Sequence, residues 1–495
     1  MRTLKSTDRS GEQGIALVMA LLMVLAVSVL TSSLVMVARS EALSSVSYTS
    51  MSQVRYGAES GIHAAANYLL WMYNAPTAAS AQDPLANYDM SGSPVRYLGR
   101  PVVLSSDPNF ASNYPADAVR AAFVANSVGS LAVNGAPVAH RARATLMSMT
   151  IVSDYYTSQP ITLQTWQIVG IGQINGSGQS LVEVEATVER QPVPVYAYAA
   201  FATHNGCNAL SFAGGANTAS YDSALPLVAG APVISQSGGN VGTNGNLDGN
   251  GGPTDINGTL STPRSGVGNC TNNNVTAATI SGFATVEEGL VQLPQPINLS
   301  TPTVPNPGAI NYNFTSASGC SGAPFCTLVA GKPTIIPPTP ASIVSMGDVK
   351  GVGSSEIHLR AGIYAINSIE LGGGSKIVID SGPVIIKVKG NGVATPIKLD
   401  GGGVSNPSLD PTKLQFVYAG TGEVKITGGT DTAALVYAPN ASAALAGAST
   451  DFYGAIITNK ITSTGGFSIF YDRRLQRTIM TAGNPMMSSF TWRTF

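Results

Sequence analysis

The pattern of apolar and polar residues is dominated by one uninterrupted apolar run near the N-terminus. Residues 15–38 are 24 positions without a charged side chain, between the polar leader MRTLKSTDRSGEQG and Arg39. As a helix this run is about 36 Å long, enough to cross a hydrocarbon core of about 30 Å. Leu, Ile and Val fill 13 of its positions, which favours insertion by about 4 to 8 kcal/mol. The pattern therefore predicts a membrane-spanning helix.

Charges on either side of the run predict its orientation. The leader carries three basic residues, Arg2, Lys5 and Arg9, against Asp8 and Glu12. Basic residues next to a span stay on the cytoplasmic side, so we expect residues from about 39 onward to lie outside. The alternative is a cleaved secretory signal, for which the small residues 31–33 are a weak cleavage site.

The helical pattern continues beyond the membrane segment. Apolar residues recur at mostly helical steps, and no proline occurs before Pro76. These residues are Leu43, Val46, Val54, Ala58, Ala65, Leu69 and Met72. We predict one helix over 15–73, and two helices broken near Ser44 and Ser45 as the alternative.

Residues 74–195 form the next region. Residues 75–110 are rich in Pro, Asp, Ser and Asn and read as a surface connection, after which the pattern changes to strands. Residues 165–171 and 180–188 bracket Asn175-Gly176-Ser177-Gly178, a sequence suited to a tight hairpin. In the second strand apolar residues alternate with Glu and Thr, so we predict a half-buried antiparallel sheet that ends at the prolines of 191–194.

From residue 196 to 480 very short apolar runs alternate with Gly and Asn corners. Tyrosines recur at the apolar runs, at Tyr364, Tyr418, Tyr437 and Tyr453. Such spacing is typical of a β-solenoid, in which each coil buries its apolar residues against its neighbours. A β-sandwich is the alternative. The predicted fold class is α+β, with a long helix, a small antiparallel sheet and a large β-rich C-terminal module.

Two segments interrupt or follow this module. Residues 293–309 contain five prolines, which predicts an extended strap along the outside of the module. Residues 481–495 form a C-terminal tail with an aromatic end, which we interpret as a capping strand or a docking segment.

The composition argues against nucleic acid as a partner. Charged residues make up 11% of the chain and the formal net charge is −1. A nucleic-acid binder needs a basic stripe for phosphate contacts, so no nucleic-acid partner is expected. Intrinsically disordered chains carry more charge and fewer aliphatic residues. The composition therefore indicates a weakly charged, strand-rich, exported protein.

All four cysteines lie beyond the apolar run, where disulfides persist. Cys320 and Cys326 flank a short turn and are the natural pair, which leaves Cys207 with Cys270. Three pairings are formally possible, and free buried thiols are the alternative. None of the cysteines has the spacing of metal ligands, and we expect no metal and no cofactor.

The sequence offers few candidate catalytic residues. None of the four histidines, His63, His140, His204 and His358, has a metal-ligand or nucleophile context. One acidic and basic group deserves a test as the active site of a polysaccharide lyase: Asp348, Lys350, Glu356 and Arg360. Asp380 and Asp400, near Gly-rich corners, are candidate calcium ligands, although capping a turn is the commoner role of such residues. We expect no enzyme activity.

Hydroxyl and amide side chains on the module suggest a second kind of site. Arrays of Thr, Ser and Asn can bind glycans, and Tyr418 and Tyr437, if exposed, can stack on sugar rings. The same residues also serve simply to keep an extracellular solenoid soluble, with the tyrosines in the core. Both interpretations stay open at this point.

Two motifs carry a family resemblance. Gly14-Ile15-Ala16-Leu17-Val18-Met19-Ala20-Leu21-Leu22, and later Tyr56-Gly57-Ala58-Glu59-Ser60-Gly61, resemble the N-terminal region of PilX-like type IV pilus assembly proteins, a group of minor pilins. The resemblance covers roughly residues 10–75. The β-rich region is similar to uncharacterised regions fused to such N-termini.

The resemblance implies how the N-terminus is processed and where the chain resides. A prepilin peptidase would cut after Gly14 and leave Ile15 as the mature N-terminus, and the helix would pack among other pilins. Most pilins carry a Glu at the fifth mature position, which here is Met19. Without that carboxylate, a tip or priming position suits the chain better than repeated incorporation along a fibre.

These observations predict a minor pilin-like protein of the bacterial inner membrane. It would cross the membrane once, keep its C-terminal region in the periplasm or at the pilus tip, and present the β-rich module for adhesion. Its expected partners are other pilins and a surface glycan or substratum ligand. Alternatives are an envelope-tethered polysaccharide-active β-helix enzyme and a pseudopilin-like component of a type II secretion system.

Overall fold

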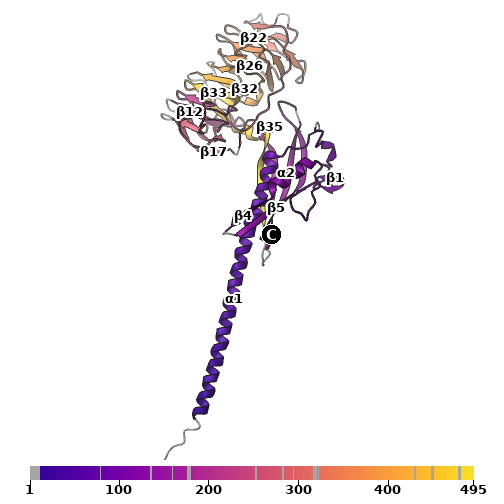
Figure 1. Ribbon diagram of the computed structural model, residues 1–495. Coiled ribbons are helices and arrows are strands. Elements are labelled where there is room, and N and C mark those ends of the chain that lie inside the picture. Colours follow the sequence, from indigo (N-terminus) through magenta and orange to yellow (C-terminus); the bar gives the residue numbers. More distant parts are fainter. Residues whose placement is uncertain are drawn as a thin grey trace, which may run out of the picture. The chain divides into compact units, whose positions relative to one another are not determined.

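A computed structural model describes most of the chain, in two compact units. The described residues are 12–77, 80–133, 136–158, 160–174, 180–250, 254–280, 284–293, 295–315, 320, 323–427, 431–447, 451–477 and 481–494. Side chains are described for these except 12–14, 136, 180, 190–193 and 481–494. Unit 1 comprises Met1–Thr150, Thr162–Gln191 and Met487–Phe495, and unit 2 comprises Ile151–Ile161 and Pro192–Met486. In chain order, the larger unit 2 is therefore an insertion before the last strand of unit 1 (Figure 1).

The long helix α1 (Glu12–Asn67) opens unit 1 and continues into the π-helical turn η1 (Tyr68–Met72). It runs without a break through Ser44 and Ser45, so the predicted single helix is confirmed and the two-helix alternative is wrong. Its N-terminal part is exposed, whereas Val54, Ala58, Ile62 and other residues of its C-terminal part are fully buried. The apolar residues of this later part lie on the face that packs on the sheet of unit 1.

The main sheet of unit 1 has the strand order β3-β5-β6-β7-β35, with β4 beside β5. Its strands are β3 (Val103–Ser105), β4 (Gly129–Val133), β5 (Ala136–Ser153), β6 (Pro160–Ile174), β7 (Ser180–Pro194) and β35 (Thr481–Thr494). Unit 1 also holds η2 (Leu85–Asn87), the two-stranded β1 (Arg96–Tyr97) and β2 (Arg100–Pro101), and helix α2 (Asp117–Ser127).

The predicted hairpin is the pair β6–β7. These strands are antiparallel, with Trp166 opposite Val188 and Gly172 opposite Val182. Val184, Ala186 and Val188 are buried while Glu183 and Glu185 are partly exposed, as the alternating pattern predicts. The turn residues 175–179 lie outside the described residues. Residues 481–494, expected as a tail, form β35 beside β7 instead.

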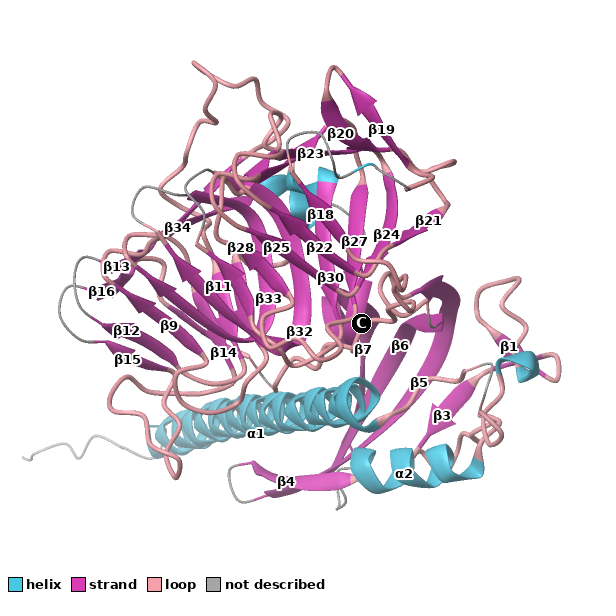
Figure 2. Cartoon of the chain, turned by 90° about the horizontal axis from the view of Figure 1, so that it is seen from above, coloured by secondary structure: helices cyan, strands magenta, loops and turns pink. Residues whose placement is uncertain are grey.

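Unit 2 is built from short strands that stack in parallel coils. In its described part, the ladders between named strands are parallel except for the hairpin β19–β20. Figure 2 shows β24, β27 and β30 side by side in one such layer. Parallel coil-on-coil pairing is the arrangement of a solenoid-like module, whereas the strands of a β-sandwich pair antiparallel.

The coils fall into two groups along the chain. The first group holds β8 (Ala200–Ala202), β9 (Leu210–Ala213), β10 (Thr218–Tyr221), β11 (Val241–Thr243), β12 (Leu247–Asn250), β13 (Thr254–Ile256), β14 (Leu260–Thr262), β15 (Ala278–Ile280), β16 (Ala284–Val286) and β17 (Leu290–Gln292). The second group begins with β18 (Tyr312–Phe314), β19 (Cys326–Val329), β20 (Lys332–Ile335), β21 (Ile343–Ser345), β22 (Asp348–Gly351), β23 (Glu356–Leu359), β24 (Gly362–Ile366), β25 (Ser368–Leu371) and β26 (Lys376–Ile379). It continues with β27 (Val384–Val388), β28 (Ile397–Leu399), β29 (Val404–Ser405), η4 (Pro411–Lys413), β30 (Leu414–Tyr418), β31 (Val424–Ile426), β32 (Thr432–Ala446), β33 (Asp451–Thr464), β34 (Ser468–Asp472) and η5 (Arg473–Arg477).

The order of the coils in the stack differs from their order in the chain. The last coil pairs with the first, because β33 lies beside β8 and β9, and β34 lies beside β10. From this junction the first group extends to β17 at one end of the stack. The second group starts at the other end with β18 and returns to the junction. The chain therefore enters and leaves the stack in its middle.

The proline-rich strap, residues 293–309, carries the chain from one end of the stack to the other. Asn244, after β11, donates to the carbonyl of Ile297 at 2.8 Å and accepts its N–H at 2.7 Å. Tyr437 of β32 donates to the carbonyl of Ser300 at 2.6 Å, and Gly308 donates to the carbonyl of Met346 at 3.0 Å. The strap is thus bonded to coils on both sides of the junction.

The predicted fold class is confirmed at this level: a long helix, a small antiparallel sheet and a large β-rich module, α+β overall. The interior of unit 2 is lined by aliphatic side chains from stacked strands, such as Val384, Ile386 and Val388 of β27. Each coil buries these residues only by stacking on its neighbours, as in other solenoids.

Candidate functional site

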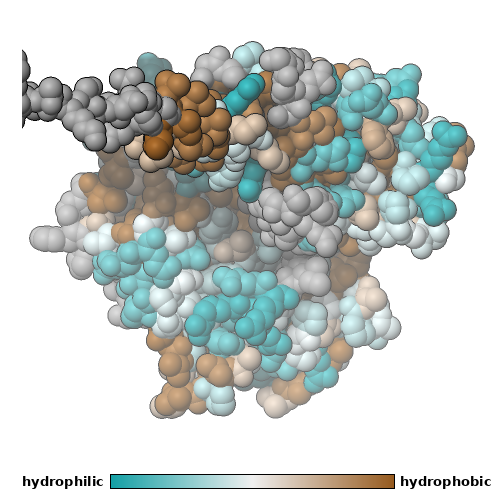
Figure 3. Space-filling model, turned by 90° about the horizontal axis from the view of Figure 1, so that it is seen from below, coloured by the Kyte–Doolittle hydropathy of each residue, from teal (hydrophilic) through white to brown (hydrophobic). Residues whose placement is uncertain are grey.

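The apolar surface of α1 is the first candidate site. Among the described residues, one helix is long and apolar enough to cross a membrane, and none of its most apolar window is buried. Ile15 is 69% exposed and Met19 is 61% exposed. Figure 3, seen from below, shows brown apolar side chains gathered at this end of the helix. An apolar surface of this extent requires a cover, and a lipid bilayer or other apolar helices supply one.

The predicted cleavage position lies at the start of this surface. The backbone of Gly14 already belongs to helix α1. Cleavage between Gly14 and Ile15 stays a prediction. Position 19 on this surface carries the apolar side chain of Met19, where most pilins have a Glu.

The motif Tyr56–Gly61 has a packing role in unit 1. A Cβ on Gly61 would overlap the carbonyl oxygen of Arg141 in β5, and a Cβ on Gly57 would lie 2.5 Å from a methyl carbon of Val138. On the sheet side, a Cβ on Gly172 would likewise overlap the carbonyl oxygen of Val54. Glycines on both elements therefore let the backbones of helix and sheet approach directly.

Two glutamates of unit 2, the candidate Glu356 and the previously unmarked Glu370, form ion-pair ladders across coils. Glu356 contacts Lys332 and Lys376, both at 3.0 Å. Glu370 contacts Lys350 at 2.9 Å and Lys398 at 2.8 Å. The paired ammonium groups lower the pKa of both carboxyls to about 2. Each carboxylate thus lies between lysines of the preceding and following coils.

This arrangement does not gather the residues proposed for a lyase site. Lys350 belongs to β22 in the large sheet, whereas Glu356 belongs to β23 in a separate five-stranded sheet. Asp348 accepts hydrogen bonds from Asn367 and Ser368. For Arg360, the structure records a main-chain role, in which its carbonyl accepts the Tyr364 hydroxyl at 2.5 Å. The four residues are dispersed among structural contacts.

The two calcium candidates are also engaged. Asp380 lies 2.7 Å from Nδ1 of His358. Asp400 contacts Lys425 at 3.2 Å and Lys398 at 3.7 Å, and it accepts the hydroxyl of Thr427. Across the described part of the chain, no group of three or more His, Cys, Asp and Glu side chains is placed to hold a metal.

Among the histidines, His140 is buried and His204 is partly buried. Burial lowers the pKa of His140, and burial together with the nearby Lys460 lowers that of His204. His358 lies between Asp380 and Glu356, whose oxygen is 3.6 Å from its Nε2. His63 lies on the part of α1 that packs on the sheet, with its side chain exposed.

The recurring tyrosines belong to the core. Tyr418 is 2% exposed and Tyr437 is 0% exposed, so the alternative that places these tyrosines in the core is confirmed and the alternative in which they stack on sugars is wrong. Tyr437 instead stacks on Tyr156 with ring centroids 4.0 Å apart. The coils bury these rings because their apolar faces fill the interior, while the hydroxyls of Tyr364, Tyr418 and Tyr437 have polar partners. Tyr418 illustrates this by accepting the N–H of Gly422 at 2.9 Å.

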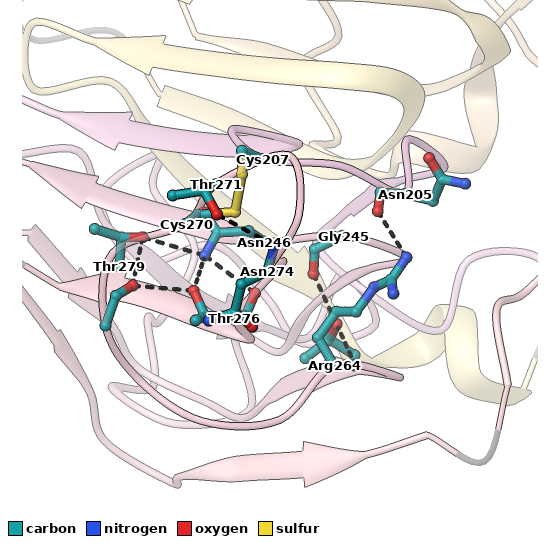
Figure 4. The surroundings of a disulfide bond; sticks show 12 residues. Asn205, Cys207, Gly245, Asn246, Arg264, Cys270, Thr271, Asn274, Thr276 and Thr279 are labelled. Atoms are coloured by element: carbon teal, nitrogen blue, oxygen red, sulfur yellow. Dashed lines mark hydrogen bonds between the residues drawn. A yellow bond between two sulfur atoms is a disulfide. The ribbon is translucent and has the colours of Figure 1, made fainter.

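All four cysteines form disulfides. Cys207 pairs with Cys270, and Cys320 pairs with Cys326. Figure 4 shows the first bond beside a polar network in which buried Asn246 donates to the carbonyl and hydroxyl of Thr276. This bond ties the long loop between β14 and β15 to the first coil of the chain. Sequence spacing favoured this pairing, and the tertiary structure brings the distant partners together.

Comparisons with known proteins add limited information. Residues 358–478 match a family described as "Domain of unknown function (DUF7305)", which spans the coils from β23 to η5. No curated protein matches the chain. A solved structure, the competence-associated pilin ComZ from Thermus thermophilus, is similar at 13% identity. The match covers 90% of this chain and 98% of that one, with a TM-score of 0.24. Because this score is low, the proposals below rest on the geometry of this chain.

Proposed function

We propose that the chain is a membrane-anchored, minor pilin-like protein that presents its β-rich module for surface contact. The observation that carries the proposal is the exposed apolar half of α1, continuous with a second half that packs on an antiparallel sheet. One helix thus joins an anchor to a folded exported body. Such a helix can lie in the membrane or among the helices of sister pilins, because both environments cover apolar side chains.

The proposal assigns no catalysis to the module. The acids examined for catalysis or calcium binding are paired with lysine, asparagine, histidine or hydroxyl groups, which supports a structural role for them. The absence of a carboxylate at Met19 favours a tip or priming position, where the register contact of repeated subunits is not required. The expected partners are other pilins through α1 and a ligand on the module.

N-terminal sequencing of the protein recovered from sheared surface appendages tests this function. The expected mature start is Ile15, because cleavage after Gly14 precedes assembly. Deletion of the gene should lower pilus number or surface adhesion. Recovery of the uncut chain only from the cytosol, or a deletion strain with normal pili and adhesion, would reject the proposal.

A further inference from the structure

Two adjoining hollows of unit 2 share one arginine. The larger, about 620 Å³, is lined by Arg473, Arg474 and Arg477 of η5 together with Asp222. The smaller, about 410 Å³, is lined by Tyr155, Lys413, Gln415 and Asp410, and again by Arg474. We call the two hollows the basic trough. Every one of these residues belongs to unit 2.

The 3₁₀ helix η5 exposes its three arginine side chains to solvent. Leu475, at the centre of η5, is buried in the core, so its neighbours on either side are directed to the surface. Arg473 and Arg477 are exposed and form no ion pair among the described residues. Arg474 lies 3.6 Å from Asp410. Asp410 is in turn committed to capping η4, where it accepts the N–H and hydroxyl of Thr412.

The charge balance of the trough differs from that of the ladders. In the ladders, each glutamate lies between two lysines of the neighbouring coils. In the trough, four cationic side chains face two carboxylates, one of them already engaged by Arg474 and Thr412. An excess of guanidinium groups around a concave surface favours ligands with carboxylate or sulfate groups, which arginine binds in a bidentate manner.

The smaller hollow adds features that suit a sugar. Tyr155 is 39% exposed, and its ring is held edge-on against Tyr156 with centroids 4.9 Å apart. Its hydroxyl donates to Gln415 at 3.3 Å. A fixed, partly exposed aromatic ring offers an apolar face for a sugar ring.

We infer that the basic trough binds an acidic polysaccharide, with sugar carboxylates on Arg473 and Arg477 and a sugar ring on Tyr155. A nucleic acid fits less well, because its closely spaced phosphates would meet Asp222 and Asp410 with only four cations to neutralise them. This inference rests on the proposed display function and names the ligand class for it.

Binding of the full-length chain in detergent to oligogalacturonate tests the inference, with a neutral glucan of equal length and a single-stranded oligonucleotide as comparison probes. We expect oligogalacturonate to bind most tightly and its affinity to fall with added salt. The double variant R473Q/R477Q should weaken binding by about tenfold or more. Tyr155→Leu should weaken it as well, whereas Tyr155→Phe should keep it because the ring remains.

The matched control is R96Q/R100Q, which removes the same charge from an exposed hairpin of unit 1 and should leave binding unchanged. Circular dichroism checks that each variant is folded. The inference is overturned by no oligogalacturonate binding, by equal binding of the neutral glucan, by preference for the oligonucleotide, or by equal loss in the control. None of these outcomes alters membrane retention or the N-terminus at Ile15, so the display proposal is judged separately.

Discussion

At the scale of single residues, glycine decides how closely the helix of unit 1 meets its sheet. A Cβ on Gly170 would overlap the carbonyl oxygen of Ala58, and a Cβ on Gly172 would overlap that of Val54. The sequence marked Gly57 and Gly61 only through a family resemblance. Their physical role is steric, since any side chain at these positions would need the space now filled by a carbonyl group or a neighbouring side chain.

Gly172→Ala should destabilise unit 1 by about 1 to 3 kcal/mol or more, because the added methyl overpacks a rigid contact. The measurement is denaturant unfolding of the purified chain. Gly92→Ala is the matched control, since nothing lies within 4 Å of a Cβ there. Equal stability of the two variants would contradict the close-approach interpretation.

Residue pairs across coils also set a dependence on pH. The pKa of Glu370 is about 2 in the fold, below its ordinary value of 4.5, because Lys398 and Lys350 flank it. The folded state therefore holds this proton less tightly than the unfolded state. The stability from this group is present above about pH 4.5 and is lost as the pH falls toward 2.

Glu370→Gln should accordingly lose less stability between pH 4.5 and pH 2 than the natural chain does. Thermal unfolding followed by circular dichroism across this range checks the difference. Glu287→Gln, at an exposed position, should follow the natural chain. If both variants change the acid response equally, the ladder is not its source.

At the scale of elements, the proline-rich strap connects the two groups of coils. Its prolines favour an extended backbone, and coils on both sides of the junction supply hydrogen bonds to it. Asn244 is the firmest contact, because its buried amide group bonds both the N–H and the carbonyl of Ile297.

Asn244→Ala should release the strap near Ile297 and cost about 1 to 3 kcal/mol, because two buried main-chain groups lose their partner. Amide hydrogen exchange should rise in the strap, and proteolysis within 293–309 should become faster. Asn313→Ala, an exposed position on β18, should change neither. Unchanged exchange in the Asn244 variant would show that other contacts hold the strap.

At the scale of the whole molecule, we expect one apolar segment, residues 15–38, to determine where the folded body resides. The balance is quantitative, since an insertion free energy of about 4 to 8 kcal/mol can be offset by a few charges placed in the middle of the span. The apolar segment is exposed and forms no part of the buried core, so charges placed there should change the location of the chain and leave its folded core intact.

The double variant L25R/V27R should lose membrane retention, because two central arginines cost about 5 to 7 kcal/mol. Carbonate-washed membranes assayed by immunoblot provide the measurement. L43R/V46R adds the same charges on the exposed helix surface beyond the apolar run and should stay in the membrane. Full retention of L25R/V27R would argue against a bilayer-spanning role.

The amino-acid sequence alone determined the local features of this protein. The length of the uncharged run predicted the apolar helix, and the alternation of apolar and polar residues predicted the β6–β7 hairpin. Short apolar runs with glycine corners predicted the coils. These signals depend on residues close together in the chain, where periodicity records which face is buried.

Only the tertiary structure decided the long-range relations. Nothing local records that β33 pairs with β8, that residues 481–494 return to the sheet of unit 1, or that Arg473 and Tyr155 line adjoining hollows. The same holds for Glu356, which the sequence offered as a candidate catalyst and which the coil register places between Lys332 and Lys376. Coil stacking depends on which surfaces meet after the chain has turned back, and a linear pattern carries no information about that choice.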